Sequence, residues 1–196
     1  MNESVRMIVV LAVIAMVSGG LLAWVYDWTG EIIAQNQLQE MMASIQEVLP
    51  KATRIERLGS APSTLVEEDP DQAREVEQTT TEMFIGFDDS DNPVGYAYVG
   101  EGPGYGGAVR VLVGVDGSNG QILGISIVSH SETPGLGSRI EEESFRRQFV
   151  GKTLDDPIAL GTDIDVLTGA TVSSQAVVDA VRGGFEDASV AYERSR

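Results

Sequence analysis

Residues 81–128, TEMFIGFDDSDNPVGYAYVGEGPGYGGAVRVLVGVDGSNGQILGISIV, carry the strongest structural signal in the chain. Apolar runs of strand length alternate here with clusters of Asp, Asn, Gly, Pro and Ser, which favour turns. The runs predict strands at 83–87, 94–99, 108–115 and 122–128. Because the connections are short, we expect neighbouring strands to pair in an antiparallel meander.

Helical patterns follow these strands. A helix is predicted at 138–149, and a second begins at Ser173, where Val177, Val181 and Phe185 repeat at the spacing of one buried face. Strands followed by helices predict an α+β fold, an antiparallel sheet with flanking helices. We assign this domain to residues 81–196.

The N-terminal part predicts a membrane anchor within residues 1–28. Residues 7–26, MIVVLAVIAMVSGGLLAWVY, contain no Asp, Glu, Lys or Arg, and a helix of that length spans about 30 Å of hydrocarbon. A cleaved signal peptide is the alternative, but it has a shorter apolar region and a small-residue cleavage site. Arg6 precedes the segment and no Lys or Arg follows before Lys51, which predicts a single pass with the N-terminus in the cytoplasm.

Residues 29–80 are expected to connect the anchor to the domain. An amphipathic helix is predicted at 31–49, ending before Pro50. Its apolar stripe consists of Leu38, Met41, Met42, Ile45, Val48 and Leu49. Residues 51–80 contain scattered prolines and an acidic run without clear periodicity, which predicts a surface connection.

The amino-acid composition limits the kinds of partner and cofactor that this chain can bind. The chain has 196 residues and a formal net charge of -17, which disfavours a nucleic-acid partner. It contains no cysteine and one histidine, so disulfides, iron–sulfur clusters and Cys- or His-rich metal sites are excluded, and we expect no metal. Redox chemistry would therefore need an organic cofactor.

The glycine cluster at 102–107, GPGYGG, formally contains G-x-G-x-x-G. A dinucleotide-binding fingerprint requires a helix after the glycines, whereas residues 108–115 predict another strand. Two interpretations stay open. The glycines either form a plain hairpin connection or leave a bare backbone that a flat ligand approaches.

The stretch HSETPGLGS at 130–138 predicts a stiff turn with Leu136 pointing outward, beside the carboxylate of Glu132 and the hydroxyl of Thr133. A loop of this kind can place its apolar side chain against the flat ring of a ligand. His130 is expected to be a structural, hydrogen-bonded histidine, because no catalytic partner set accompanies it.

The stretch DVLTGATVSS at 165–174 leads into the last helix. Thr171 is either a helix N-cap or an accessible hydroxyl beside small residues, where the free N–H groups of the helix start favour a phosphate. It lacks an evident base, so forming a phosphoester there would need an external transferase.

Asp-x-x-Thr-Gly-Ala-Thr at 165–171 resembles the flavinylation motif of proteins that carry FMN by a phosphoester to the final threonine. Together with Glu-Thr-Pro-Gly-Leu-Gly at 132–137, the whole chain resembles the RnfG family, the flavin-carrying subunits of the Rnf-type ion-translocating oxidoreductases, with their extracytoplasmic, covalent FMN-binding domain. The resemblance implies a cofactor-binding set of Thr171, as the attachment residue, with Thr168, Gly169, Ala170, Ser174, Glu132, Thr133, Leu136 and Tyr105.

The resemblance implies an electron-transfer subunit of a membrane-bound ferredoxin:NAD oxidoreductase in the cytoplasmic membrane. Its partners would be the other membrane and redox subunits, a flavin transferase for maturation, and the lipid bilayer; ion movement would belong to the partner subunits. Two alternatives stay open. One is the NqrC component of a sodium-pumping NADH:quinone oxidoreductase, which usually has a longer chain, and the other is a membrane-anchored acidic binding module without flavin.

Overall fold

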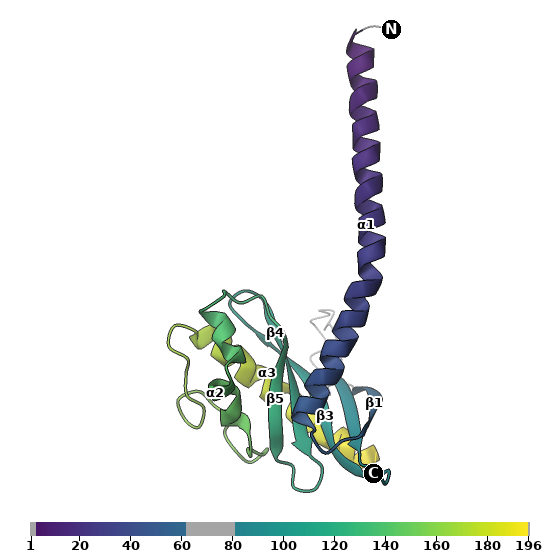
Figure 1. Ribbon diagram of the computed structural model, residues 1–196. Helices are drawn as coiled ribbons and strands as arrows, with labels where there is room; N and C mark the ends of the chain where they lie inside the picture. Colours follow the sequence, from purple (N-terminus) through teal and green to yellow (C-terminus); the bar gives the residue numbers. More distant parts are fainter. Residues whose placement is uncertain (1–2, 62–80, 196) are drawn as a thin grey trace, which may run out of the picture. The chain divides into compact units, whose positions relative to one another are not determined.

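The structure, a computed structural model, describes residues 3–61 and 81–195 (Figure 1). By internal contacts the chain forms two compact units, Met1–Met42 and Ala43–Arg196. The elements are α1 (Glu3–Val48), β1 (Arg54–Ala61), β2 (Thr81–Phe87), β3 (Pro93–Pro103), β4 (Ala108–Asp116), β5 (Ile122–Ser129), the 3-10 helix η1 (Gly137–Glu141), α2 (Glu143–Arg146), the 3-10 helix η2 (Arg147–Phe149) and α3 (Thr171–Ser195).

The long helix α1 runs without a break through the uncharged segment and through most of the predicted amphipathic helix, and it ends just before Pro50. Large apolar side chains such as Leu11, Leu22 and Trp24 are exposed on it. Across the residues that the structure describes, no helix has a stretch both long and apolar enough to span a bilayer.

The sheet has the strand order β1-β2-β3-β4-β5, with each strand antiparallel to the next. The predicted meander is therefore confirmed, and its strands lie at the predicted places with slightly wider bounds. The prediction that residues 51–80 form only a connection is wrong for 54–61, which form β1. This edge strand carries Arg54, Glu56 and Arg57, and charges at a sheet edge obscure the apolar alternation. Residues 62–80 lie outside the described part.

Helix α3 packs across one face of the sheet and forms the core with it. Its backbone approaches β3 closely, because Gly100 and Gly102 face Ala180 and Ala176: a Cβ on either glycine would lie 1.9–2.0 Å from a helix carbonyl oxygen. Larger apolar side chains fill the space on both sides of this crossing, among them Tyr98, Val111, Val113, Val177, Val181 and Phe185.

The last turn of α1, which belongs to the second unit, covers the other face of the sheet. Ile45, Val48 and Leu49 from the predicted apolar stripe are buried, whereas Met42 is exposed; the side chain of Leu38 lies outside the described part. Glu47 fixes this turn through an ion pair to Arg146 at 2.8 Å.

The predicted helix at 138–149 is instead three short turns, η1, α2 and η2. The helix is interrupted at Glu142, whose ψ of 132° is extended rather than helical. After η2 the chain returns to the start of α3 through a loop in which Asp163 accepts hydrogen bonds from the amides of Ile158 and Ala159 and pairs with Lys152. This loop delivers residues 165–170 to the end of the sheet where β3 turns into β4.

Candidate functional site

One pocket gathers the motifs that the sequence singles out. It has a volume of about 510 Å³, within the range of roughly 300 to 1,000 Å³ that is usual for small-molecule sites. Three segments form it: the β3–β4 hairpin loop, the loop between β5 and η1, and the start of α3. Its lining consists of Tyr105, Glu132, Thr133, Leu136, Gly137, Gly169, Ala170, Thr171, Val172 and Ser173.

Most of the predicted cofactor-binding residues line this pocket, but Thr168 and Ser174 do not. Thr168 lies outside the pocket, and its carbonyl accepts a hydrogen bond from Arg139 Nη1 at 3.4 Å. Ser174 is fully buried, and its hydroxyl donates to the Ala170 carbonyl at 2.9 Å. Both therefore shape the turn before α3 rather than the pocket surface.

Glu132 fastens the three segments together. Its side chain is buried, and one oxygen, Oε2, accepts a hydrogen bond from Ser173 Oγ at 2.6 Å. The other oxygen accepts from the Gly106 amide at 3.0 Å. Burial raises the pKa of Glu132, but these hydrogen bonds and one from the Tyr105 amide outweigh it and hold the pKa below the ordinary value of 4.5. The carboxylate is thus ionised at neutral pH.

The glycine loop is the connection between β3 and β4, and a strand follows it, so the rejection of a dinucleotide-binding fingerprint is confirmed. Other atoms of the protein occupy the space that side chains on these glycines would need. A Cβ on Gly104 would lie 2.3 Å from Glu132 Oε1, and one on Gly106 would lie 2.0 Å from the Ser131 carbonyl oxygen. The absent side chains allow the loop to close against the Glu132 segment.

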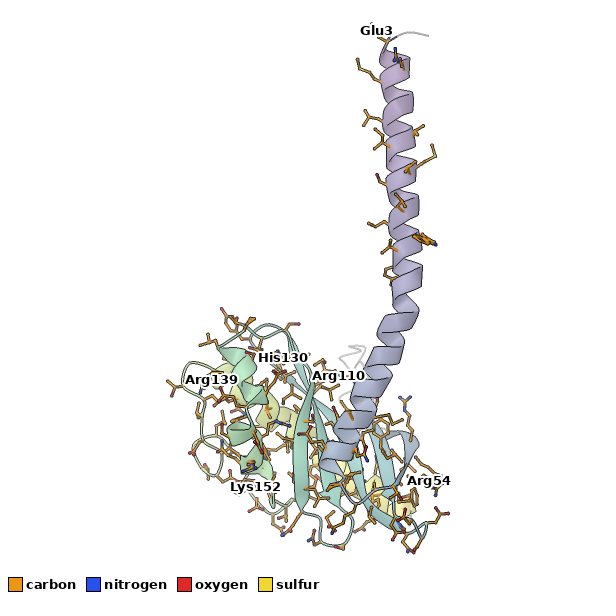
Figure 2. All side chains as sticks on the ribbon, viewed as in Figure 1. Glu3, Arg54, Arg110, His130, Arg139 and Lys152 are labelled. Atoms are coloured by element: carbon orange, nitrogen blue, oxygen red, sulfur yellow. The ribbon has the colours of Figure 1, made fainter. Side chains whose placement is uncertain are left out.

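His130 has the structural role that the sequence favours. Its Nδ1 accepts a hydrogen bond from the Glu132 amide at 3.1 Å, so in the neutral ring Nε2 carries the proton. Nε2 lies 3.0 Å from Oε1 of Glu141, to which it donates. Figure 2 shows His130 and Arg139 at the same end of the unit. His130 therefore fixes the backbone from which Glu132 enters the pocket.

Thr171 is the first residue of α3, and its side chain is exposed. The first intrahelical bond is donated by the Ser174 amide to the Ala170 carbonyl, at 2.9 Å. Ala170 is therefore the N-cap residue, and the N-cap interpretation of Thr171 is wrong. The amides of Thr171, Val172 and Ser173 have no acceptor within the helix, so the helix start offers N–H groups and a positive dipole end beside the Thr171 hydroxyl.

Apolar side chains line the mouth of the pocket. The side chains of Tyr105, Leu136 and Val172 are 79%, 48% and 50% exposed. Apolar side chains that are exposed together in this way are typical of a surface that a ligand or partner covers. Gly169 has a φ of +82°, and a Cβ there would lie 3.1 Å from Leu136 Cδ1, so the Thr-Gly-Ala-Thr turn needs glycine at this position. The pocket thus combines an apolar rim with a polar floor.

Sequence reasoning missed Gly137, Val172 and Ser173 as lining residues. Each lies within or next to a motif, but the sequence does not reveal which side chains face inward. A Cβ on Gly137 would lie 2.4 Å from Glu132 Oε2, so this glycine makes room for the buried carboxylate.

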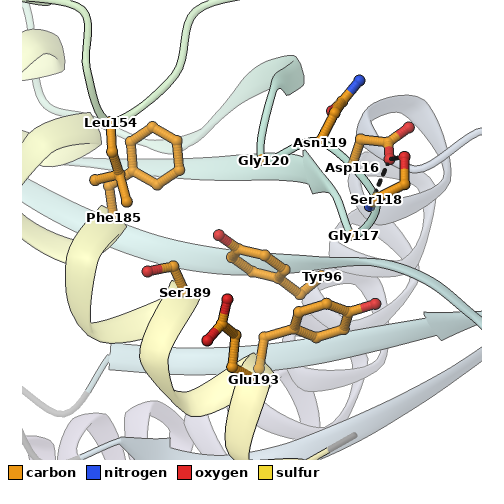
Figure 3. Close-up of a pocket in the computed structure, with 11 residues that line it drawn as sticks. Tyr96, Asp116, Gly117, Ser118, Asn119, Gly120, Leu154, Phe185, Ser189 and Glu193 are labelled. Atoms are coloured by element: carbon orange, nitrogen blue, oxygen red, sulfur yellow. Dashed lines mark hydrogen bonds between the residues drawn. The ribbon is translucent and has the colours of Figure 1, made fainter.

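A second pocket of about 360 Å³ lies at the other end of β3 and α3 (Figure 3). The rings of Tyr96 and Tyr192 pack there in a tilted arrangement, with centroids 4.8 Å apart and an interplanar angle of 30°. They lie beside the β4–β5 turn, in which Asp116 accepts hydrogen bonds from Ser118. None of the predicted site residues lines it.

Family matches define the class of protein. Residues 104–186 match the FMN-binding domain family, and this segment contains all three walls of the first pocket. Residues 6–48 match the RnfG N-terminal region.

Full-length relatives define the family. The G-type subunit of the ion-translocating oxidoreductase complex of Methanosarcina acetivorans is 33% identical, over 94% of this chain and 94% of that protein. The corresponding protein of Salmonella typhi is 36% identical over 89% and 85%. Its counterpart in the proton-translocating ferredoxin:NAD(+) oxidoreductase complex of Clostridium ljungdahlii is 29% identical over 90% and 86%. The chain belongs to this family, the G-type subunits of ion-translocating oxidoreductase complexes.

Solved structures share the fold. NqrC of Shewanella oneidensis superposes with a TM-score of 0.60 at 16% identity, covering 82% of this chain and 98% of that one. The C-type subunit of the Na(+)-translocating NADH-quinone reductase from Parabacteroides distasonis gives 0.50 at 19% identity, covering 78% and 94%. At such identities the likeness concerns the fold alone.

Proposed function

We propose that this chain is a flavin-carrying electron-transfer subunit of a membrane-bound, ion-translocating ferredoxin:NAD oxidoreductase, and that it holds FMN through a phosphoester to Thr171. The observation that carries the proposal is the position of Thr171, an exposed hydroxyl at the first turn of α3 on the wall of the pocket. The relatives named as subunits of such complexes support the role in electron transfer.

The residues present fit FMN. The phosphate is an anion, and the helix start supplies amide donors and a positive dipole end next to Thr171. The isoalloxazine is a large flat ring, and Tyr105, Leu136 and Val172 offer apolar surface at the pocket mouth. Leu136 also meets the turn at Gly169, so ring contact and attachment residue belong to one continuous surface.

When bound, FMN supplies the electron-transfer chemistry. This chain's residues hold and orient it: the attachment at Thr171 prevents dissociation, and Glu132 keeps the three walls together. The Thr-Gly-Ala-Thr stretch at 168–171 contains no basic side chain that could activate the Thr171 hydroxyl, so we propose that a flavin transferase makes the bond during maturation. The isolated chain is not expected to turn over substrate by itself.

We further propose that residues 7–26 anchor the chain in the cytoplasmic membrane, with the N-terminus inside and the flavin domain outside. The proposal is supported by the uncharged sequence, by the position of Arg6 before it and by the exposed apolar side chains of α1. The partners would then be the lipid bilayer and the membrane and redox subunits of the complex, which would contain the ion path.

The test of the attachment uses three variants co-expressed with a flavin transferase. Thr171→Ala removes the oxygen that would form the ester, whereas Thr171→Ser keeps a hydroxyl at the same place. Thr168→Ala removes a hydroxyl of the same motif that lies outside the pocket. In-gel flavin fluorescence after denaturing electrophoresis should vanish in Thr171→Ala and persist in the other two.

Thr171→Ala should remain folded, because Thr171 is exposed and is not the cap residue. A folded but non-fluorescent Thr171→Ala chain supports the proposal. Fluorescence that survives in Thr171→Ala, or that disappears from Thr168→Ala alone, would place the linkage elsewhere.

A further inference from the structure

We infer that the carboxylate of Glu132 lowers the reduction potential of the flavin held in this pocket, so that Glu132 is a tuning residue as well as a structural one. The inference rests on the proposed function. Its basis is the juxtaposition of a buried carboxylate with the pocket wall that carries Thr171.

Glu132 keeps its charge inside the protein. Both oxygens accept hydrogen bonds, from Ser173 Oγ and the Gly106 amide, and these bonds favour the ionised form. Within the described part of the chain no Lys, Arg or His lies within 4 Å of this carboxylate as an ion-pair partner. Hydrogen bonds stabilise the negative charge locally but do not cancel it.

Among the neighbouring ionisable groups, His130 interacts with the charge of Glu132 and helps to lower the pKa of this carboxyl, but less than any of its hydrogen bonds does. Its ring is not an ion-pair partner of Glu132: it binds the Glu132 amide through Nδ1 and Glu141 through Nε2. In η1, Arg139 pairs with Glu142 at 2.9 Å. The β3–β4 loop contributes the phenol group of Tyr105, and the first turn of α3 contributes the hydroxyls of Thr171, Ser173 and Ser174.

A fixed negative charge opposes electron uptake beside it. Two-electron reduction of a flavin consumes two electrons and either one proton, which leaves an anion, or two protons, which leaves a neutral molecule. A carboxylate in the same partly desolvated pocket disfavours the anion and therefore favours uptake of the second proton. Removing this charge should raise the reduction potential and lower the pH at which the reduced flavin loses its second proton.

Glu132→Gln is a suitable variant. It keeps the size of the side chain, and its carbonyl can accept from the Gly106 amide while its NH₂ group donates to Ser173 Oγ, since a hydroxyl both donates and accepts. Glu101→Gln is the matched control, because it removes an equal charge from an exposed position on β3 that is screened by solvent.

The experiment is a potentiometric titration of the full flavinylated chain from acidic to alkaline pH, with dithionite as reductant and ferricyanide as oxidant. Glu132→Gln should have a more positive midpoint potential than wild type at neutral and alkaline pH, where Glu132 of wild type is ionised. The bend in its plot of potential against pH, which marks loss of the second proton, should lie at lower pH. Glu101→Gln should follow wild type in both respects.

A second variant keeps the inference testable if Glu132→Gln folds poorly. Ser173→Ala retains the carboxylate but removes a hydrogen bond to its charged form, so Glu132 should take up its proton at higher pH. As the pH is lowered, the potential of Ser173→Ala should therefore rise above that of wild type, and the two should coincide at neutral pH.

Covalent flavin in Glu132→Gln with unchanged potential and an unchanged bend would overturn this inference and leave the proposed function intact. Coincident plots for Ser173→Ala and wild type at all pH values would do the same. A wild-type chain without flavin on Thr171 would overturn the proposed function and this inference with it.

Discussion

The close backbone contact between β3 and α3 gives a sharp test of how the fold positions the site. Replacing Gly102 by Ala places a Cβ 2.0 Å from the Ala176 carbonyl oxygen, whereas Cβ contacts below 3.0 Å are essentially never seen. The helix must therefore move away by at least 1.0 Å, which is the difference between those distances. Because the obstacle is backbone, no side-chain rotation can relieve it.

The expected cost lies at the upper end of overpacking effects, about 3 kcal/mol. For a chain of this size that corresponds to a fall of roughly 6 to 12 °C in Tm. Since α3 begins at Thr171, the displaced helix should also reduce covalent flavin loading. Thermal and urea unfolding measure the first effect, and the ratio of flavin to protein absorbance measures the second.

Gly183→Ala is the control in the same helix. A Cβ there would have nothing within 4 Å, so this change should stabilise the protein by about 0.5 to 1 kcal/mol through helix propensity. If Gly102→Ala were as stable as wild type, the close packing of α3 on β3 would be refuted.

Three further outcomes are expected. Leu136→Asp should leave the fold intact, because Leu136 is half exposed, but should weaken ring packing; an unchanged flavin absorption spectrum and potential would remove Leu136 from the contact surface. The lowered pKa of Glu132 should stabilise the fold above about pH 4.5, and this contribution is lost as the pH falls through the folded-state pKa. The difference in the free energy of unfolding between wild type and Glu132→Gln, measured by urea unfolding, should therefore shrink below about pH 4.5. A difference that stays constant down to about pH 3 would contradict the lowered pKa of Glu132. Protease added outside intact spheroplasts should digest the chain beyond about Tyr26, whereas complete protection would reverse the proposed orientation.

Much of the fold could be predicted because its signals are local. The strands β2 to β5 are strongly apolar and are bounded by turn residues, and α3 repeats Val177, Val181 and Phe185 on one face. β1 was not predicted, because an edge strand pairs on one side only and tolerates charged residues such as Arg54 and Glu56. These charges obscure the apolar alternation of a strand. The turns from η1 to η2 were predicted as one helix because the apolar spacing continues across the extended Glu142.

The site was predictable as a set of motifs but not as an arrangement. Glu132, Leu136 and Thr171 lie in recognisable stretches, yet the hydrogen bond between Ser173 and Glu132 joins residues 41 positions apart. Such a contact depends on how the loop from η2 to α3 returns across the end of the sheet. Local patterns also misplaced Ser174, since only the helix phase shows that its hydroxyl turns back to Ala170.

The most direct test of the account is the mass of the tryptic peptide that contains Thr171, which lies between the cleavage sites at Lys152 and Arg182. After expression with a flavin transferase, the peptide should carry the added mass of FMN less one water, and fragmentation should place that mass on Thr171. An unmodified peptide from yellow protein, or the added mass on Thr168 or Ser173, would contradict the proposed linkage.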